Sequence, residues 1–173
     1  THNHYITLGN GGVDSRGRGC YGIEQGGINM PIISDWDAVS KVLHQPFPSS
    51  VVKALPGVAT KDGTKALSML YVDARAVAER LDAAVGPGNW DFGFEVLHND
   101  LKHMVVKGKL TIGEVTREDV GEGKTTGLAG ENACKGAVSD ALKRCAVLFG
   151  VGAYFYRMPQ LWLAFDNQKK KFI

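Results

Sequence analysis

The sequence predicts an α+β fold in which helices pack on one side of an antiparallel β-sheet. The predicted elements follow the order helix, hairpin, helix, antiparallel strands, helix, which favours this class over a doubly wound parallel fold. The spacing of apolar residues also changes from the helical period to a period of two at about residue 90. A length of 173 residues, with 44% hydrophobic and 22% charged residues, suits one globular domain with an appendage.

The appendage is predicted to be the first 33 residues. This segment is rich in glycine and shows no apolar periodicity, so it cannot bury enough surface to offset the entropy of ordering it. We therefore expect residues 1–33 to be a flexible leader.

Two helices are predicted in the first half of the remaining chain. Ser34 can cap a helix that ends near His44, before a pair of prolines. Asp73 can cap a second helix that continues to about Val85, where the sequence Gly86-Pro87-Gly88 ends it.

A β-hairpin, or a strand followed by a long loop, is predicted between these helices, at residues 51–70. The segment alternates loosely around two turn signals, Pro56-Gly57 and Asp62-Gly63. Its charges are mostly basic, and the basic residues are Lys53, Lys61 and Lys65.

Two antiparallel strands and a final helix are predicted after residue 89. The first strand places one set of apolar residues on one face: Trp90, Phe92, Phe94 and Val96. A turn at 98–100 leads to a partner strand at 103–112, whose apolar face holds Met104, Val106, Leu110 and Ile112. Residues 117–130 are polar and rich in glycine, and are predicted to be a loop. The last helix is predicted at 132–148.

Several classes of site are disfavoured by residue spacing. Cys20, Cys134 and Cys145 lack the spacing of a zinc site, and we expect Cys134 and Cys145 to be small buried residues. The Gly-Lys-Thr sequence at 123–125 resembles the end of a phosphate-binding loop, but Glu118 stands where that motif needs its first glycine. We predict no metal, no cofactor and no catalytic residue, and an enzyme is the weaker hypothesis.

No apolar run approaches the roughly 18 residues of a membrane span, and the N-terminus does not resemble a signal peptide. We therefore expect no membrane association and a cytoplasmic, intracellular protein.

The basic residues point to a polyanion partner. Residues 131–173 carry seven basic and three acidic residues, whereas the rest of the chain is slightly acidic. Lys143 and Arg144 are adjacent on the last helix, and Lys135 lies about two turns earlier. A solvated helix face is the ordinary explanation for such charges. Together with the hairpin lysines and the Lys107/Lys109 pair, however, they could line a groove that binds a phosphate backbone without reading its sequence.

One long motif lies in the last predicted helix and just after it. It runs from Ala137 to Gly150 with the sequence AVSDALKRCAVLFG, and continues through VGAYFY to Pro159. This motif resembles the signature of the Rad fifty-two recombination-mediator superfamily, in its bacterial DdrA and phage-like branch. Three further motifs resemble the same family in the same order: Tyr71-Val72-Asp73, Gly88-Asn89-Trp90 and residues 119–123. The resemblance covers about residues 35–165.

The resemblance implies a β-β-β-α core that assembles into a ring, with single-stranded DNA in an outer groove. By this resemblance, Lys143 and Arg144 match the paired basic residues of the groove floor, and Lys135 matches another basic position of the same helix. The hairpin that overhangs the groove contains Lys53, Lys61 and Lys65. Val147 and Ala153 stand at positions where some members have arginine.

The implied organisation is a leader at 1–33, an annealing-protein domain at 34–165 and a basic tail at 166–173. Lys169, Lys170 and Lys171 of this tail fit a solvated tail and a DNA contact equally well. The predicted function is sequence-independent single-stranded DNA binding, with strand annealing and end protection in DNA repair or recombination at the nucleoid. The alternative is a structural assembly protein of the same fold that does not act on DNA. The sequence identifies no recombinase partner.

Overall fold

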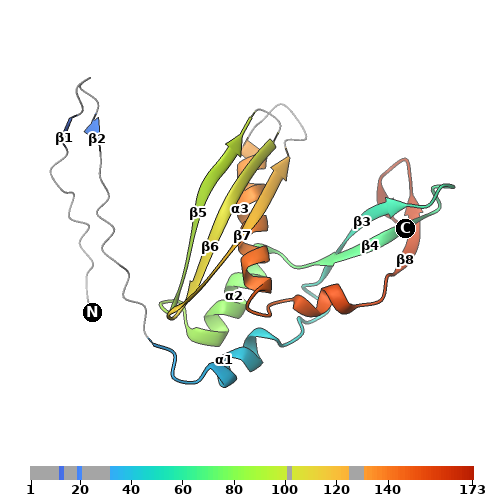
Figure 1. Cartoon of the computed structure of the whole chain (residues 1–173). Helices are drawn as coiled ribbons and strands as arrows, with labels where there is room; N and C mark the ends of the chain where they lie inside the picture. The colour runs from blue at the N-terminus through green and yellow to red at the C-terminus, as the bar shows by residue number, and fades with distance from the viewer. Residues whose placement is uncertain (1–11, 14–18, 21–31, 101–102, 125–130) are drawn as a thin grey trace.

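The computed structural model describes residues 12–13, 19–20, 32–100, 103–124 and 131–173 (Figure 1). Its helices are α1 (Trp36–Leu43), α2 (Ala74–Val85) and α3 (Glu131–Val147), with a short 3-10 helix, η1 (Ala153–Arg157). The strands are β1 (Gly12–Val13), β2 (Gly19–Cys20), β3 (Lys53–Ala59), β4 (Lys65–Tyr71), β5 (Trp90–Asn99), β6 (His103–Ile112), β7 (Val115–Lys124), β8 (Trp162–Asp166) and β9 (Lys171–Phe172). All strand pairs are antiparallel, so the predicted α+β class is confirmed.

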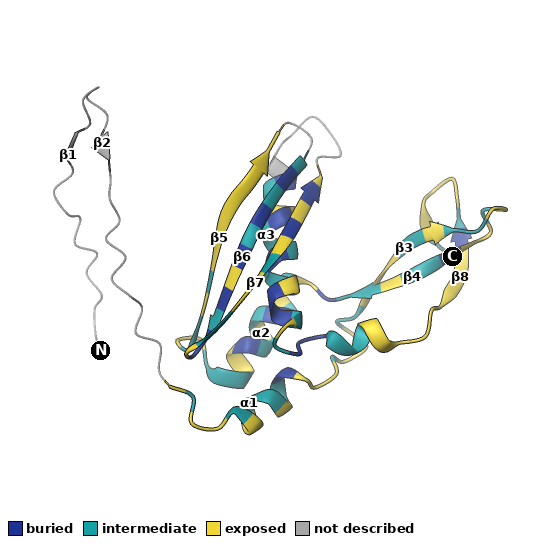
Figure 2. Cartoon of the chain, viewed as in Figure 1, coloured by how far each residue is buried: buried dark blue, intermediate teal, exposed yellow. Residues whose placement is uncertain are grey.

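The centre of the molecule is a three-stranded sheet, β5-β6-β7, which we call the core sheet. Helix α3 lies along one face of it (Figure 1). The predicted faces of β6 are confirmed, because every second residue of this strand is buried. The buried set contains Met104, Val106, Leu110 and Ile112 (Figure 2).

The prediction of a loop at 117–130 is wrong for its first part, because residues 115–124 form β7. This strand is polar and rich in glycine since its inner face meets the backbone of α3 directly. A Cβ atom added at Gly121 would lie within 3 Å of the backbone of Ala137 and Ala141, and one at Gly123 would meet the backbone of Ala133 equally closely. Only glycine fits there, and glycine carries no strand signal. Residues 125–130 lie outside the described part of the chain.

Helices α1 and α2 pack at the end of the core sheet and begin close to where they were predicted. Asp35, rather than Ser34, caps α1, because its carboxylate accepts a hydrogen bond of 2.9 Å from the Ala38 N–H. Asp73 is the residue before α2, but its side chain makes no capping bond. Gly86 ends α2 with a φ of 83°, a conformation that favours glycine.

A second sheet projects beside α3, with the order β3-β4-β8-β9, and we call it the hairpin sheet (Figure 1). Strands β3 and β4 form a hairpin, which confirms the β-hairpin predicted at residues 51–70. Strands β8 and β9 have no counterpart among the predicted elements. The segment predicted as a basic tail starts at Asp166, the last residue of β8, and includes β9.

Within residues 1–33 the structure describes β1, β2 and residues 32–33, so the flexible leader stays a prediction. Among the cysteines, Cys145 is buried as expected and Cys134 is only partly buried. The side chain of Cys20 lies outside the described residues.

Candidate nucleic-acid interface

A groove of about 580 Å³ runs between the hairpin sheet and the C-terminal half of α3. One side is formed by strands β3 and β4, and the other by the α3 residues Asp140, Lys143, Arg144 and Val147. The segment 151–161, which contains η1, closes the groove along one end. Three parts of the chain that are distant in sequence therefore meet at this surface.

Lys143 and Arg144, which were predicted to bind DNA, both line this groove. The Lys143 Nζ lies 5.8 Å from the centre of the Tyr71 ring, at the end of β4, and 4.0 Å from the Asp140 carboxylate on its own helix. A cation positioned over an aromatic face is attracted electrostatically by the ring. Tyr71 thus connects the hairpin sheet to the basic residues of α3.

Arg144 is held by a carboxylate of β7. Its Nε and Nη2 atoms each lie 3.1 Å from the same oxygen of Asp119. Burial lowers the pKa of the guanidinium, but the hydrogen bond and the charge of Asp119 outweigh burial and raise the pKa of Arg144 above its ordinary value. The side chain is fixed and permanently charged, while its remaining N–H donors stay available to an anion.

The hairpin lysines lie around the groove rather than inside it. Lys53 pairs with Asp73 at 2.5 Å, and this hydrogen bond raises the pKa of the lysine. Lys53 stands opposite Tyr71 in the β3–β4 register, so both project from the hairpin face that turns toward α3. Lys65 lies on that same face by alternation along β4, and Lys61 lies in the turn that joins the strands. None of these three lysines lines the groove wall.

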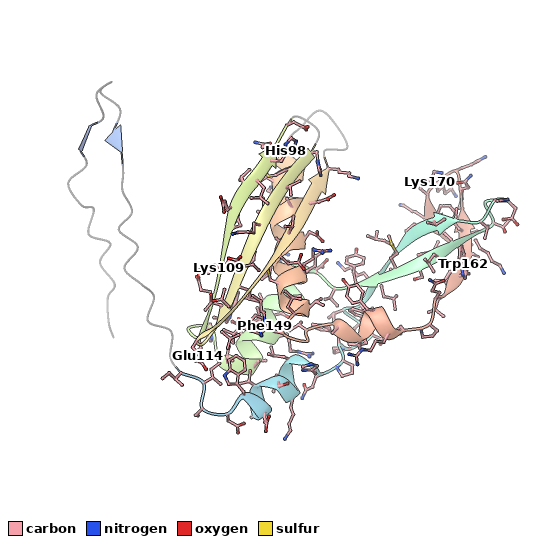
Figure 3. The ribbon with its side chains drawn as sticks, in the orientation of Figure 1. His98, Lys109, Glu114, Phe149, Trp162 and Lys170 are labelled. Atoms are coloured by element: carbon pink, nitrogen blue, oxygen red, sulfur yellow. The ribbon has the colours of Figure 1, made fainter. Side chains whose placement is uncertain are left out.

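The other basic residues are not brought together with Lys143 and Arg144. Lys135 is exposed on α3 but lies outside the groove. Lys107 lies on the outer face of the core sheet, between Glu95 at 3.8 Å and Glu118 at 3.6 Å. Lys109 also lies on the core sheet, away from the hairpin sheet that carries Trp162 (Figure 3). The suggestion that Lys107 and Lys109 help to line the groove is therefore wrong.

The non-polar part of the groove was not predicted from the sequence. Its exposed members come from the hairpin strands and from the segment after α3, and they are Leu55, Met69, Tyr156, Met158 and Leu161. One signal was present in the sequence: the segment AYFYRMPQLWL concentrates aromatic and apolar residues after Gly152 without helical or strand periodicity. Val147, where some relatives have arginine, also lines the groove.

The groove presents cations and non-polar side chains. Within the described residues, no three histidine, cysteine, aspartate or glutamate side chains are close enough to hold a metal ion together. No helix in that part of the chain combines the length and apolar character of a membrane span. The groove instead combines fixed cations with non-polar surface, as proteins that bind single strands commonly do.

Comparisons with known proteins give two kinds of match. The model of the Rad52/22 family of double-strand break repair proteins matches residues 36–172. A single-stranded DNA-binding protein DdrA of Deinococcus deserti is 46% identical over 133 residues, which are 77% of this chain and 64% of the relative. The protein of the same name from Deinococcus radiodurans is 45% identical over 132 residues, or 76% of this chain and 61% of the relative. The chain therefore spans less than two thirds of the length of these relatives.

Proposed function

The chain belongs to the Rad52/22 family of double-strand break repair proteins, and from this membership we propose that it binds single-stranded DNA and anneals complementary strands. The observation that carries the proposal is the groove, where Lys143 and Arg144 face the hairpin sheet across a space of about 580 Å³. Relatives that are 45% and 46% identical over about three quarters of this chain are named for single-stranded DNA binding.

The proposed binding is independent of DNA sequence. Lysine and arginine side chains that contact phosphates fix the position of a strand without reading its bases. Lys143 and Arg144 are the proposed phosphate contacts, with Lys53, Lys61, Lys65 and Lys135 as a surrounding positive field. A strand held in this way is protected at its ends and available for DNA repair or recombination inside the cell, at the nucleoid.

Annealing by this mechanism requires no covalent chemistry. A strand held extended has fewer self-pairs and has already lost part of the conformational entropy that pairing would cost. We therefore propose a binding protein rather than an enzyme. Annealing should proceed with EDTA present and ATP absent, and strict dependence on ATP would contradict this mechanism.

We also propose that copies of the chain assemble into a ring. Repetition along a ring would raise the overall affinity, because weak contacts in each subunit act on the same strand. One surface supports such assembly: the edge strand β5 exposes about half of each of three apolar side chains, Phe94, Val96 and Leu97. An exposed apolar edge strand commonly pairs with another chain. Light scattering should give a mass many times 18.6 kDa, and a monomer at micromolar concentration would contradict the ring.

The test of the DNA site compares two double variants that remove the same charge. Replacing Lys143 and Arg144 by alanine should weaken binding to single strands of every sequence, measured by fluorescence anisotropy. The slope of log affinity against log salt should fall by about 1.4, because each phosphate contact contributes roughly 0.7 on a single strand. Replacing Lys107 and Lys109 by alanine, on the outer face of the core sheet, should leave most of that slope intact.

Thermal unfolding must show that both variants fold, because removal of Arg144 leaves Asp119 without its guanidinium partner. A folded Lys143/Arg144 variant with unchanged affinity and salt slope would show that the groove is not the DNA site. A folded oligomer that binds no single strand at low salt would instead favour the structural assembly protein.

A further inference from the structure

Two turns meet at the end of the hairpin sheet that points away from α3, and we call this surface the lysine tip (Figure 1). One is the β3–β4 turn at residues 60–65, and the other is the β8–β9 turn at residues 166–171. The turns are in contact, because a Cβ atom added at Gly63 would lie 3.3 Å from the Asn167 side chain. Together they carry five lysines and two aspartates. The five lysines are all exposed, and they are Lys61, Lys65, Lys169, Lys170 and Lys171.

The positive charge of the lysine tip is not balanced within the two turns. Lys169 lies 3.7 Å from Asp166, but among the described residues no carboxylate lies within 4 Å of the other four lysines. Both aspartates accept hydrogen bonds from residues of their own turn. In the groove, by contrast, Lys143 and Arg144 each have an aspartate as a neighbour. The lysine tip is therefore the surface with charge left for an anion from outside the chain.

Non-polar surface separates the lysine tip from the cations of the groove. Tyr71, whose ring lies beside Lys143, is six residues along β4 from Lys65, or about 20 Å at 3.3 Å per residue. The β4 side chains between them on that face belong to Leu67 and Met69. The described hairpin thus has cations at its root and at its tip, with a non-polar strip between them.

Two of the tip lysines project from the same face of the hairpin sheet as Tyr71. Lys65 lies on that face by alternation along β4, and it pairs with Ala164 of β8. Lys171 pairs with Asp166, two residues further along β8, so its side chain lies on the same face as that of Lys65. The lysine tip therefore presents charge on the side of the sheet that turns toward the groove.

We propose that the lysine tip binds the phosphate backbone of the second, complementary strand while the first strand occupies the groove. The inference rests on the proposed function and goes beyond it, because it assigns a separate surface to the incoming strand. A strand carries one charge per nucleotide. A single backbone that ran from the groove to the tip would place several of these charges on the non-polar strip, where nothing replaces their hydration. Two separated cationic surfaces suit two backbones better than one.

The reason for a separate surface is electrostatic. A strand in the groove neutralises the cations there and repels its complement, because both strands are negatively charged. An excess of lysine outside the groove attracts the second strand and raises its local concentration, which speeds association. Contacts between lysine and phosphate carry no sequence information, so the base pairs alone select the complement.

The test separates binding of the first strand from annealing of the second, in the double variant Lys65→Ala/Lys171→Ala. Fluorescence anisotropy measures the affinity for one labelled oligonucleotide, and energy transfer between two labelled complements measures the annealing rate with the first strand saturated. At about 0.15 M ionic strength, charges are screened over about 8 Å, so affinity for the first strand should change by less than about twofold. The annealing rate should fall by about threefold or more, a part of the roughly 10- to 1,000-fold that charge steering supplies. The rate should also depend less steeply on salt.

Two control variants separate position from charge. Lys41→Ala/Lys109→Ala removes the same charge from two exposed lysines on α1 and on the core sheet, and it should anneal like the wild type. Lys65→Arg/Lys171→Arg keeps the charge at the lysine tip and should also anneal like the wild type. Thermal unfolding and light scattering should be the same for all variants, since every substituted side chain is exposed. A change of mass in Lys65→Ala/Lys171→Ala would assign the lysine tip to contacts between copies and overturn the inference.

The two proposals fail in different ways. A wild-type protein that binds no single strand, or that binds one without annealing it, would overturn the proposed function itself. If the wild type anneals and Lys65→Ala/Lys171→Ala anneals equally fast, the proposed function stands and the inference about the second strand is wrong. If the variant instead loses affinity for the first strand by the same factor as annealing, the lysine tip contacts the first strand, and the inference is again wrong.

Discussion

The core sheet and the hairpin sheet are both antiparallel, yet the central strand of the core sheet buries its non-polar residues whereas most of those in the hairpin sheet stay partly exposed. In β6, every second residue from Met104 to Ile112 is buried in the core. In the hairpin sheet, all of which the structure describes, only Ala66 and Phe165 are buried, and Leu55 and Met69 remain half exposed (Figure 2). The core sheet therefore holds more of the buried non-polar surface, whereas the hairpin sheet leaves much of its own exposed.

The hairpin sheet joins the core at its root, where Val72 directly after β4 is buried with Leu110 and Ile112, and two polar contacts add to this connection. Tyr71 contacts Lys143 of α3, and Lys53 pairs with Asp73 at the start of α2. Exposed ion pairs of this kind contribute little to stability. This division explains how a site can carry exposed apolar residues while the fold that positions it stays well packed.

The largest expected effect tests this contrast by removing one large side chain from each sheet. Leu110→Ala removes a fully buried side chain from β6 and should lower the free energy of unfolding by about 2–5 kcal/mol. Met69→Ala in the hairpin should cost less than about 1 kcal/mol, because half of its side chain is already in water. Urea denaturation measures both. Similar losses in the two variants would show that the sheets share one stabilising core.

A somewhat smaller effect tests the close contact between β7 and α3. Gly121→Ala places a methyl group against the backbone of α3 and should destabilise the fold by about 1–3 kcal/mol. Gly93→Ala is the matched control in β5, since a Cβ there meets nothing within 4 Å, and should change stability by no more than about 0.5 kcal/mol. If Gly121→Ala were neutral, the close approach would not be the reason for glycine in this strand.

The smallest expected effect concerns the turns that close the two sheets, each of which holds a hydrogen-bonded carboxylate. Glu114, between β6 and β7, accepts bonds of 3.1 Å from the Trp36 indole and the Ile33 N–H, and these lower its pKa. Asp62, in the hairpin turn, has its pKa lowered by the hydroxyl and backbone N–H groups of Thr60 and Thr64. In both turns the carboxylate is stabilised in its charged form.

A carboxylate whose pKa is lowered by folding adds stability above its unfolded pKa, and this stability is lost as the pH falls through the folded pKa. Wild type should therefore be more stable than Glu114→Gln at pH 7, and the difference should shrink as the pH falls below 4.5. For Asp62→Asn the corresponding loss should begin below 3.8. Urea denaturation at several pH values measures both differences, and a difference that stayed constant down to pH 2 would contradict the role of ionisation.

The sequence by itself determined the elements whose signal is local. The helical stripe of α2, the alternating faces of β6, and the hairpin with its Asp62-Gly63 turn follow from periodicity and turn chemistry within a few residues. The apolar face predicted for β5 is partly buried at Trp90 and Phe92, but Phe94 and Val96 are about half exposed. Lys143 and Arg144 were found in the same way, as adjacent cations on a helix within a recognisable motif.

Only the tertiary structure decided the rest. Strand β7 carries glycines because the α3 backbone meets it, and a strand β8 at Trp162 forms because β4 offers it an edge. Asp73 pairs with Lys53 instead of capping its helix, and Tyr156 borders the same groove as Leu55 although about a hundred residues separate them. The physical reason is common to these cases: the partner that gives each residue its role comes from a distant part of the chain, and local periodicity carries no information about it.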